Sequence, residues 1–263
     1  MLMRIISRYR YLFLLLPLQN WNCINNEAAP AIVKNNPIRS VHQLPYKDTT
    51  ANHPIPSIQF LTGRFNYRTD TSFLRLPDSL STKEVYLKKE AFQAFFQMQQ
   101  AARKSGVRLK VISGTRNFSE QKAIWERKWA LESQSINDPI AICKKILTYS
   151  SMPSTSRHHW GTDMDINSLQ SSYFKSGRGL REYQWLTTHA KKYGFHQVYS
   201  KKTSGRTGYN EEEWHWSYMP LSSTYLNAYN ASITYKHIYG FTGSENAPKV
   251  RIIEDFVNGI QPW

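Results

Sequence analysis

The chain has 263 residues and a mass of 30.7 kDa, and its 40 % hydrophobic and 20 % charged residues are typical of a folded protein and exclude wholesale disorder. One short apolar run, at the start, excludes a bundle of membrane-spanning helices, and two cysteines are too few for a disulfide framework or a four-thiolate zinc site. Lysine and arginine number 34 against 19 acidic residues, so the net charge is +15, and it is still +12 without the three arginines of residues 1–23.

The chain begins with the basic stretch MLMRIISRYR, which the apolar run YLFLLLPL follows. This order predicts a secretory signal, because the run is too short to cross a bilayer. Cys23 lies where a bacterial lipoprotein carries its lipid, although the residues before it are not the usual small ones, and Ala29-Pro30-Ala31 offers another cleavage site. We therefore expect a signal peptide over residues 1–23, or cleavage after residue 31. The protein would be exported to the periplasm or cell envelope, with membrane anchorage through Cys23 left open.

Residues 24–83 are expected to form a linker or an extended N-terminal wrap, because Asn, Pro and Thr cluster in their first part. From residue 86 apolar residues recur at spacings of three and four, which predicts a helix to about residue 105, ended by Gly106. The helix face consists of Leu87, Ala91, Phe95, Met98 and Ala102. Alternation over 107–112 then predicts a half-buried strand.

Three more helices are predicted further along the chain. The first covers 119–129 with Ser119 as its N-cap, the second covers 181–193 and ends at Gly194, and the third lies near 247–258. Residues 221–263 are expected to be a C-terminal extension that packs on the domain. This order of elements fits one α+β domain.

Polar residues that carry chemistry concentrate in three stretches, 113–121, 156–165 and 211–218. His158, Asp165 and His215 would make a His-Asp-His zinc set that leaves one coordination position for water. A carboxylate of the acidic run just before His215 could take the proton of that water. Spacing alone does not select these ligands, because His159, Asp163, His189 and His196 are also available.

The three stretches resemble the signatures of VanY-type D-alanyl-D-alanine carboxypeptidases, zinc metallopeptidases of the group that includes lysostaphin and hedgehog signalling domains. The first signature, Ser-Gly-x-Arg followed by Gln, is met by Ser113, Gly114, Arg116 and Gln121. The second, Ser-x-His-x-x-Gly-x-x-x-Asp, is met by Ser156, His158, Gly161 and Asp165, and the third, Glu-x-x-His, by Glu212 and His215. The resemblance covers residues 84–220. It implies a zinc carboxypeptidase domain there, built as a small antiparallel sheet flanked by helices with the zinc site in the sheet cleft.

The resemblance also implies a role for each matching residue. One zinc ion per chain would be bound by His158, Asp165 and His215. Glu212 would be the general base that activates the water and later protonates the leaving amine, and Arg116 would steady the oxyanion. The substrate would be held by Gln121, Ser156 and Ser113.

Two positions in these stretches leave alternatives open. In a regular strand over 211–218, Glu213 and not Glu212 would share the face of His215. The family pattern selects Glu212, which requires the strand to begin only near Trp214. Asp163 departs from the small residue often found at this place in the family, and it is either an orienter of a ligand histidine or a tolerated variant.

We therefore expect an exported, monomeric zinc metallopeptidase that removes the terminal D-alanine of peptidoglycan stem peptides. An L,D-carboxypeptidase, a peptidoglycan endopeptidase with the same zinc site and a non-catalytic cell-wall-binding module are the alternatives. The positive charge suits polyanionic cell-wall polymers. Nucleic acid is not expected as a partner, because no helix-turn-helix, zinc-finger or RNA-binding motif accompanies the charge.

Overall fold

The computed structural model describes residues 56–262. The predicted signal peptide, its two cleavage sites, the lipid anchor on Cys23 and the first part of the predicted linker lie outside the described residues. Within 56–262, none of the helices combines the length and the apolar character that crossing a bilayer requires.

A four-stranded antiparallel sheet forms the centre of the described part, in the order β3-β4-β6-β5. These strands are β3 (Val111–Ser113), β4 (Asp163–Ile166), β6 (His215–Tyr218) and β5 (Phe195–His196). Outside it, β1 (Phe73–Arg75) and β2 (Tyr86–Lys88) form a two-stranded antiparallel sheet. The predicted α+β class with a small antiparallel sheet is confirmed.

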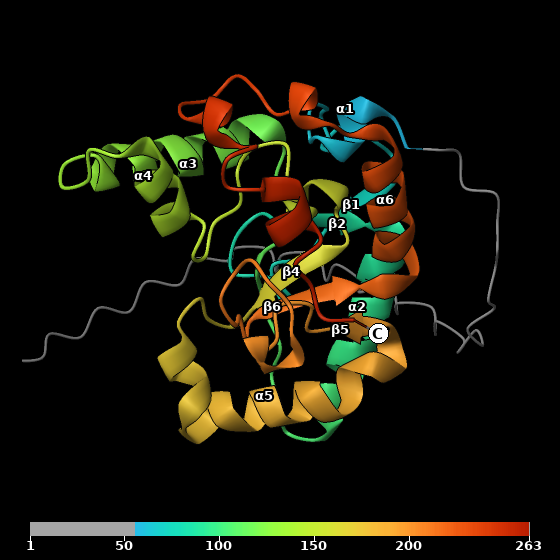
Figure 1. The fold of residues 1–263 in the computed structure, drawn as a ribbon. Helices are drawn as coiled ribbons and strands as arrows, with labels where there is room; N and C mark the ends of the chain where they lie inside the picture. The colour runs from blue at the N-terminus through green and yellow to red at the C-terminus, as the bar shows by residue number, and fades with distance from the viewer. Residues whose placement is uncertain (1–55, 263) are drawn as a thin grey trace, which may run out of the picture. The chain divides into compact units, whose positions relative to one another are not determined.

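Helices surround this sheet. They are α1 (Ile58–Leu61), α2 (Lys89–Lys104), α3 (Phe118–Glu132), α4 (Pro139–Ile146), α5 (Gly177–His189) and α6 (Met219–Ser232). Figure 1 shows α5 on one side of the sheet and the adjoining pair α3 and α4 on the opposite side in this view. The chain between α6 and residue 262 is built from short helical turns, including a π-helix over Ile252–Val257.

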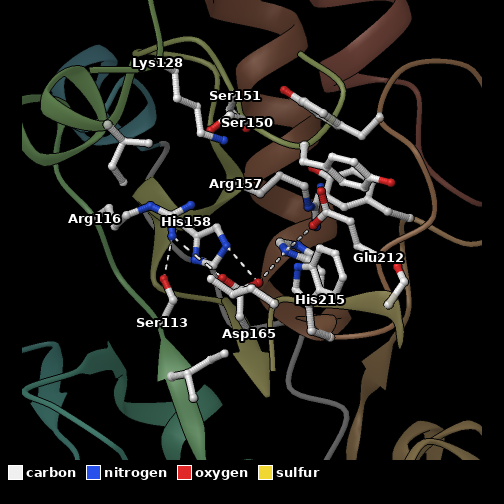
Figure 2. Close-up of a pocket in the computed structure, with 18 of the residues that line it drawn as sticks. Ser113, Arg116, Lys128, Ser150, Ser151, Arg157, His158, Asp165, Glu212 and His215 are labelled. Atoms are coloured by element: carbon white, nitrogen blue, oxygen red, sulfur yellow. Dashed lines mark hydrogen bonds and ion pairs between the residues drawn. The ribbon is translucent and has the colours of Figure 1, made fainter. Parts of the chain in front are cut away.

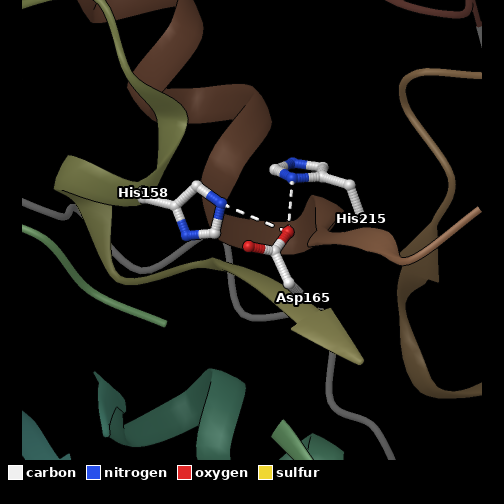
Figure 3. A group of neighbouring side chains, drawn as sticks. All are labelled: His158, Asp165 and His215. Atoms are coloured by element: carbon white, nitrogen blue, oxygen red, sulfur yellow. Dashed lines mark hydrogen bonds and ion pairs between the residues drawn. The ribbon is translucent and has the colours of Figure 1, made fainter. Parts of the chain in front are cut away.

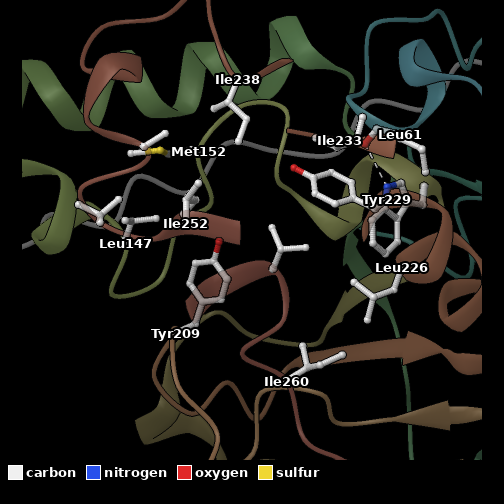
Figure 4. Close-up of a cluster of buried hydrophobic side chains, with 14 of the residues drawn as sticks. Leu61, Leu147, Met152, Tyr209, Leu226, Tyr229, Ile233, Ile238, Ile252 and Ile260 are labelled. Atoms are coloured by element: carbon white, nitrogen blue, oxygen red, sulfur yellow. Dashed lines mark hydrogen bonds between the residues drawn. The ribbon is translucent and has the colours of Figure 1, made fainter. Parts of the chain in front are cut away.

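Two apolar cores hold these elements together. The first lies under α2, whose buried side chains Ala91, Phe95, Met98 and Ala102 include four of the five residues predicted for its face. The second packs α6 and the C-terminal turns around Trp125, Trp160 and Tyr229, and Figure 4 shows part of it. Burial of side chains of this size is the main favourable term in folding.

Residues 56–83 belong to the segment predicted as a linker or wrap, and here they are integral to the folded unit. Leu61 is fully buried in the second core, and Leu76 is fully buried in the first. The backbone of this segment also joins the structure, because β1 pairs with β2 and Ser81 bridges to Val111.

Several predicted boundaries differ in the structure, each for a local reason. The helix predicted from residue 86 is α2, and it begins at Lys89, because Leu87 lies in β2 and pairs with Leu74. The strand expected over 107–112 occupies 111–113. Before it, the Asn167 side chain accepts a hydrogen bond from the Lys110 N–H and donates one to the Arg108 carbonyl, so these two groups need no partner on a neighbouring strand.

The predicted helix ends also shift. Asn117, not Ser119, caps α3 through a capping box: the Asn117 side chain accepts from the Glu120 N–H, and the Glu120 carboxylate accepts from the Asn117 N–H. The helix expected over 181–193 begins earlier, as α5, and continues as a 3-10 turn to Tyr193. Gly194, at φ +80°, ends it as predicted. A regular helix over 247–258 is wrong, because Arg251 at φ +52° breaks it before the π-helix.

Candidate active site

His158, Asp165 and His215 meet at the centre of the sheet (Figure 3). Asp165 in β4 is the register partner of His215, the first residue of β6. His158 comes from the 3-10 turn Arg157–Trp160, which Gly161 ends at φ +71°, a conformation that favours glycine, so that the chain enters β4. One ligand atom from each side chain lies within 4.8 Å of the others, and all three residues are buried.

The hydrogen bonds around the two histidines determine which ring nitrogen faces Asp165. Nδ1 of His158 lies 2.8 Å from the Gly114 carbonyl oxygen, which can only accept, so Nε2 is left with a lone pair 3.5 Å from Oδ1 of Asp165. Nε2 of His215 lies 3.0 Å from Oδ1 of Asp163, which leaves Nδ1 3.2 Å from the same Asp165 oxygen. A cation among these atoms would satisfy them, and two imidazoles with a carboxylate are ligands that zinc prefers.

Electrostatics favour positive charge at the same place. Burial alone would lower the pKa of His215, but its hydrogen bonds to Asp163 and Asp165 outweigh burial and raise that pKa to about 9. The pKa of Asp165 lies well below its usual value despite burial, because His158 and His215 stabilise the carboxylate. The residues present therefore fit a metal centre both in donor type and in charge.

Asp163 lies behind this cluster and contacts His215. Its Oδ1 accepts a hydrogen bond from Nε of Arg157 at 2.9 Å, and its Oδ2 accepts one from the Thr162 hydroxyl at 2.6 Å. Arg157 is fully buried and also donates to the Ser217 hydroxyl at 2.6 Å. Of the two possibilities left open for Asp163, the geometry favours the orienter of His215.

The other histidines considered as ligands have different surroundings. Nδ1 of His159 lies 2.7 Å from the carbonyl oxygen of Arg116, and the ring of His189 stacks on Trp185 with centroids 4.7 Å apart. Neither these nor His196 belongs to the cluster of potential metal ligands found among residues 56–262.

Glu212 faces the cluster and Glu213 turns away from it. Glu212 lines the cavity beside the three residues, and its Oε2 lies 3.9 Å from Nδ1 of His215. Burial raises the pKa of Glu212 to about 8. Glu213 bonds instead to the Ser171 hydroxyl and the Lys175 ammonium. The arrangement arises because 211–214 is not strand: β6 begins at His215, whose N–H reaches back to the Glu212 carbonyl.

Arg116 enters the same cavity in a fixed orientation. Its Nη1 lies 3.8 Å from Oδ2 of Asp165 and donates to the Ser113 hydroxyl at 2.5 Å. Its Nε donates to Oε1 of Gln121, whose amide is tied in turn to the Ser151 carbonyl. Ser113 lines the cavity, whereas Gln121 lies behind Arg116 and Ser156 is buried outside the cavity lining. Substrate contact by Gln121 and Ser156 therefore stays a prediction, and Gln121 holds Arg116 in place.

The cavity has a volume of about 700 Å³, and Figure 2 shows most of its lining. Several walls of the cavity were not predicted from the sequence, namely Tyr149, Tyr199, Tyr209, Arg157 and Lys128. The ring of Tyr199 packs on His215 with centroids 4.6 Å apart. Lys128 could have been found, because it follows Gln121 by seven residues and so lies on the same helix face. The tyrosines carry no comparable signal, because they lie on irregular segments.

Comparison with known proteins connects this site to one family. The family model VanY, D-alanyl-D-alanine carboxypeptidase, matches residues 84–221, just over half of the chain. The chain is 31 % identical over 136 residues to "Putative carboxypeptidase YodJ" of Bacillus subtilis (strain 168), and 29 % identical over 125 residues to a D-alanyl-D-alanine carboxypeptidase of Enterococcus faecalis (strain ATCC 700802 / V583).

These matches cover 51 % and 47 % of this chain but only 46 % and 44 % of the two relatives, so the chain spans less than half of their length. Among solved structures, VanYB in complex with D-alanine-D-alanine is similar, with a TM-score of 0.48 and 22 % identity. That similarity covers 64 % of this chain and 87 % of the other.

Proposed function

The chain belongs to the VanY family of D-alanyl-D-alanine carboxypeptidases, and from this premise we propose that it is a zinc-dependent enzyme that removes the terminal D-alanine of peptidoglycan stem peptides. One observation supports the proposal most: the buried side chains of His158, Asp165 and His215 converge in a cavity that Glu212 and Arg116 also line. A structural metal site needs neither a carboxylate nor a guanidinium beside it in addition to its ligands.

One zinc ion per chain would be held by His158, Asp165 and His215. When bound, zinc supplies Lewis-acid chemistry and lowers the pKa of water. Gly114 and Asp163 fix the tautomers of the two histidines, so that both present lone pairs toward the ion.

Glu212 moves the proton in this proposal. Burial raises its pKa, and the charge of a divalent cation beside it lowers that pKa again, so that the carboxylate is ionised at neutral pH. It then accepts the proton of the attacking water and delivers it to the amine nitrogen of the departing D-alanine. Each turnover therefore returns Glu212 to its ionised form.

Arg116 stabilises the negative charge that develops on the scissile carbonyl oxygen. Its guanidinium cannot lose its proton at physiological pH, and Gln121 and Ser113 hold it in one orientation. Preorganised donors of this kind contribute on the order of 3 kcal/mol to the stability of a transition state.

The place of action is part of the proposal. We place the protein in the cell envelope, because its substrate is there and its net charge of +15 favours association with anionic wall polymers. A monomer is also part of the proposal.

Hydrolysis of defined stem peptides, with the zinc content measured on the same sample, tests the proposal. The purified protein is incubated with a pentapeptide ending in D-alanyl-D-alanine and with the corresponding tetrapeptide, and mass spectrometry identifies the products. We expect about one zinc per chain and loss of one D-alanine from the pentapeptide. Cleavage of the tetrapeptide alone would make the enzyme an L,D-carboxypeptidase, and bound zinc without cleavage of either peptide would contradict carboxypeptidase function.

A further inference from the structure

The cavity is lined by a half-buried cation, Lys128, that makes no direct ion pair with a carboxylate of residues 56–262. Five lysine or arginine side chains line it, against the carboxylates of Asp165 and Glu212, and Arg157 and Arg116 lie beside Asp163 and Asp165 respectively. Lys83 and Arg127 are exposed, so water solvates their charges. Lys128 is half-buried and forms no ion pair with the residues of 56–262.

The position of Lys128 is set by α3, the helix that also fixes Arg116. Lys128 lies two turns beyond Gln121 on the same helix face, about 10 Å along the axis. Figure 2 shows its side chain extending toward Ser150 and Ser151 at one end of the cavity. The capping box of Asn117 and Glu120 anchors the start of the helix, so the ammonium group is presented from a rigid element.

Lys128 also lies within electrostatic reach of the catalytic groups. Burial lowers the pKa of its ammonium, and the charges of Glu212 and Arg116 act on that pKa in opposite directions. A partly desolvated ammonium with no counter-ion gains more from an anionic ligand than a fully solvated one does. Serine hydroxyl groups beside it add neutral donors suited to carboxylate oxygens.

We propose that Lys128, with the hydroxyl groups of Ser150 and Ser151, is the subsite for the C-terminal carboxylate of the peptide. The inference rests on the proposed function and deepens it, because it makes the free carboxylate the recognised feature of the substrate. In a peptide losing one residue, that carboxylate lies one residue, roughly 4 Å, beyond the scissile carbonyl. It therefore has to be bound close to Arg116 and Glu212, and an endopeptidase substrate has no charge at this point.

Binding of a matched pair of peptides to the Glu212→Gln protein tests the subsite without turnover. The probes are a stem pentapeptide ending in D-alanyl-D-alanine and the same peptide with a C-terminal amide, and calorimetry measures both. We expect the acid to bind about 10- to 100-fold more tightly than the amide, the range for a charge-assisted hydrogen bond. Adding Lys128→Met should remove this preference, and adding Lys128→Arg should keep most of it.

Lys122→Met is the matched control, because it removes the same charge from the same helix at a position outside the cavity lining. In the Glu212→Gln background it should leave the preference for the acid unchanged. Equal binding of acid and amide before any change at Lys128, or a preference that survives Lys128→Met, overturns the subsite. Failure of the wild-type protein to cleave the acid contradicts the proposed function instead, and the binding comparison still decides the subsite.

Discussion

His215 lies between two carboxylates, and its two ring nitrogens have different tasks. Nε2 bonds to Asp163, which Arg157 and Thr162 hold in place, and Nδ1 faces Asp165. Because a neutral imidazole carries one proton, the bond to Asp163 decides which nitrogen can bind a metal. At the residue scale, metal binding depends on Asp163 and the residues that hold it as well as on the three ligands.

Replacement of Asp163 by Asn should weaken zinc binding with little effect on the fold. The amide keeps the size of the carboxylate but neither its charge nor its preference for one tautomer of His215, and losses of this kind typically reduce metal affinity 10- to 100-fold. Competition with a chromophoric chelator measures the affinity. Asp78→Asn, at an exposed carboxylate paired with Arg75, serves as the control. Equal affinities of Asp163→Asn and wild-type protein would show that Asp163 does not orient His215.

The Arg157–Asp163 pair should also matter for stability. Both side chains are almost completely buried, so Arg157→Met leaves the Asp163 carboxylate in the interior without its guanidinium partner and should lower the free energy of unfolding by about 3–5 kcal/mol. The exposed pair Arg75–Asp78 offers the comparison, and Arg75→Met should cost less than about 1 kcal/mol. Urea denaturation of both variants provides the test, and similar losses would contradict the assigned role of burial.

At the scale of elements, α3 links the fold to the site. It begins at the capping box of Asn117 and Glu120, and its inner face carries Gln121 against Arg116. Loss of the N-terminal cap of this helix should therefore lower the stability of the fold, and through Gln121 it should also affect the position of Arg116.

Asn117→Ala should lower the free energy of unfolding by about 1 kcal/mol, because it removes the side chain that accepts from the Glu120 N–H. Ser119→Ala is the matched control. Ser119 lies inside the helix and caps nothing, so we expect a change within about 0.5 kcal/mol. Urea denaturation distinguishes the two, and a larger loss for Ser119→Ala would contradict the observed cap.

The sequence predicts those helices and strands whose residue pattern depends only on near neighbours in the chain. The apolar spacing gave the buried face of α2, and Gly194 marked the end of the helical segment that begins with α5. Helices α4 and α6 were not predicted. The sequence of α6 shows little amphipathic pattern, because its buried face includes the polar or partly polar residues Ser222, Tyr225 and Tyr229 beside its leucines. The strand ending at Ser113 was predicted too early, because the bonds from Asn167 come from 57 residues away.

The same distinction applies to the candidate site. His158, Asp165 and His215 were selected through family signatures, and strand alternation alone pointed to Glu213 rather than Glu212. Only the start of β6 at His215 brings Glu212 to the cavity. The tyrosine walls and the pairing of Arg157 with Asp163 depend on tertiary packing, which short-range spacing does not carry.

At the scale of the whole described unit, the candidate metal centre joins segments that are distant in sequence. His158, Asp165 and His215 come from the turn before β4, from β4 itself and from β6. An ion bound there would stabilise the folded state by mass action, by about 2.7 kcal/mol at a free concentration one hundred times the dissociation constant.

Removal of zinc should therefore lower the midpoint of unfolding. Urea denaturation in the presence of zinc and of excess chelator measures the difference for the wild-type protein. His215→Ala should show little difference between the two conditions, because it lacks one ligand. A wild-type midpoint that does not respond to chelation would contradict a metal bound by the folded state.

The central claim is that Glu212 moves the proton in a zinc-dependent carboxypeptidase, and two neighbouring substitutions test it most directly. Glu212→Gln and Glu213→Gln make the same chemical change at adjacent buried positions, but only Glu212 lines the cavity. Release of D-alanine from the pentapeptide is measured for both at equal zinc content. The account predicts a loss of about 100-fold or more in kcat for Glu212→Gln and nearly unchanged activity for Glu213→Gln. Equal activities of the two variants, or a loss confined to Glu213→Gln, would contradict it.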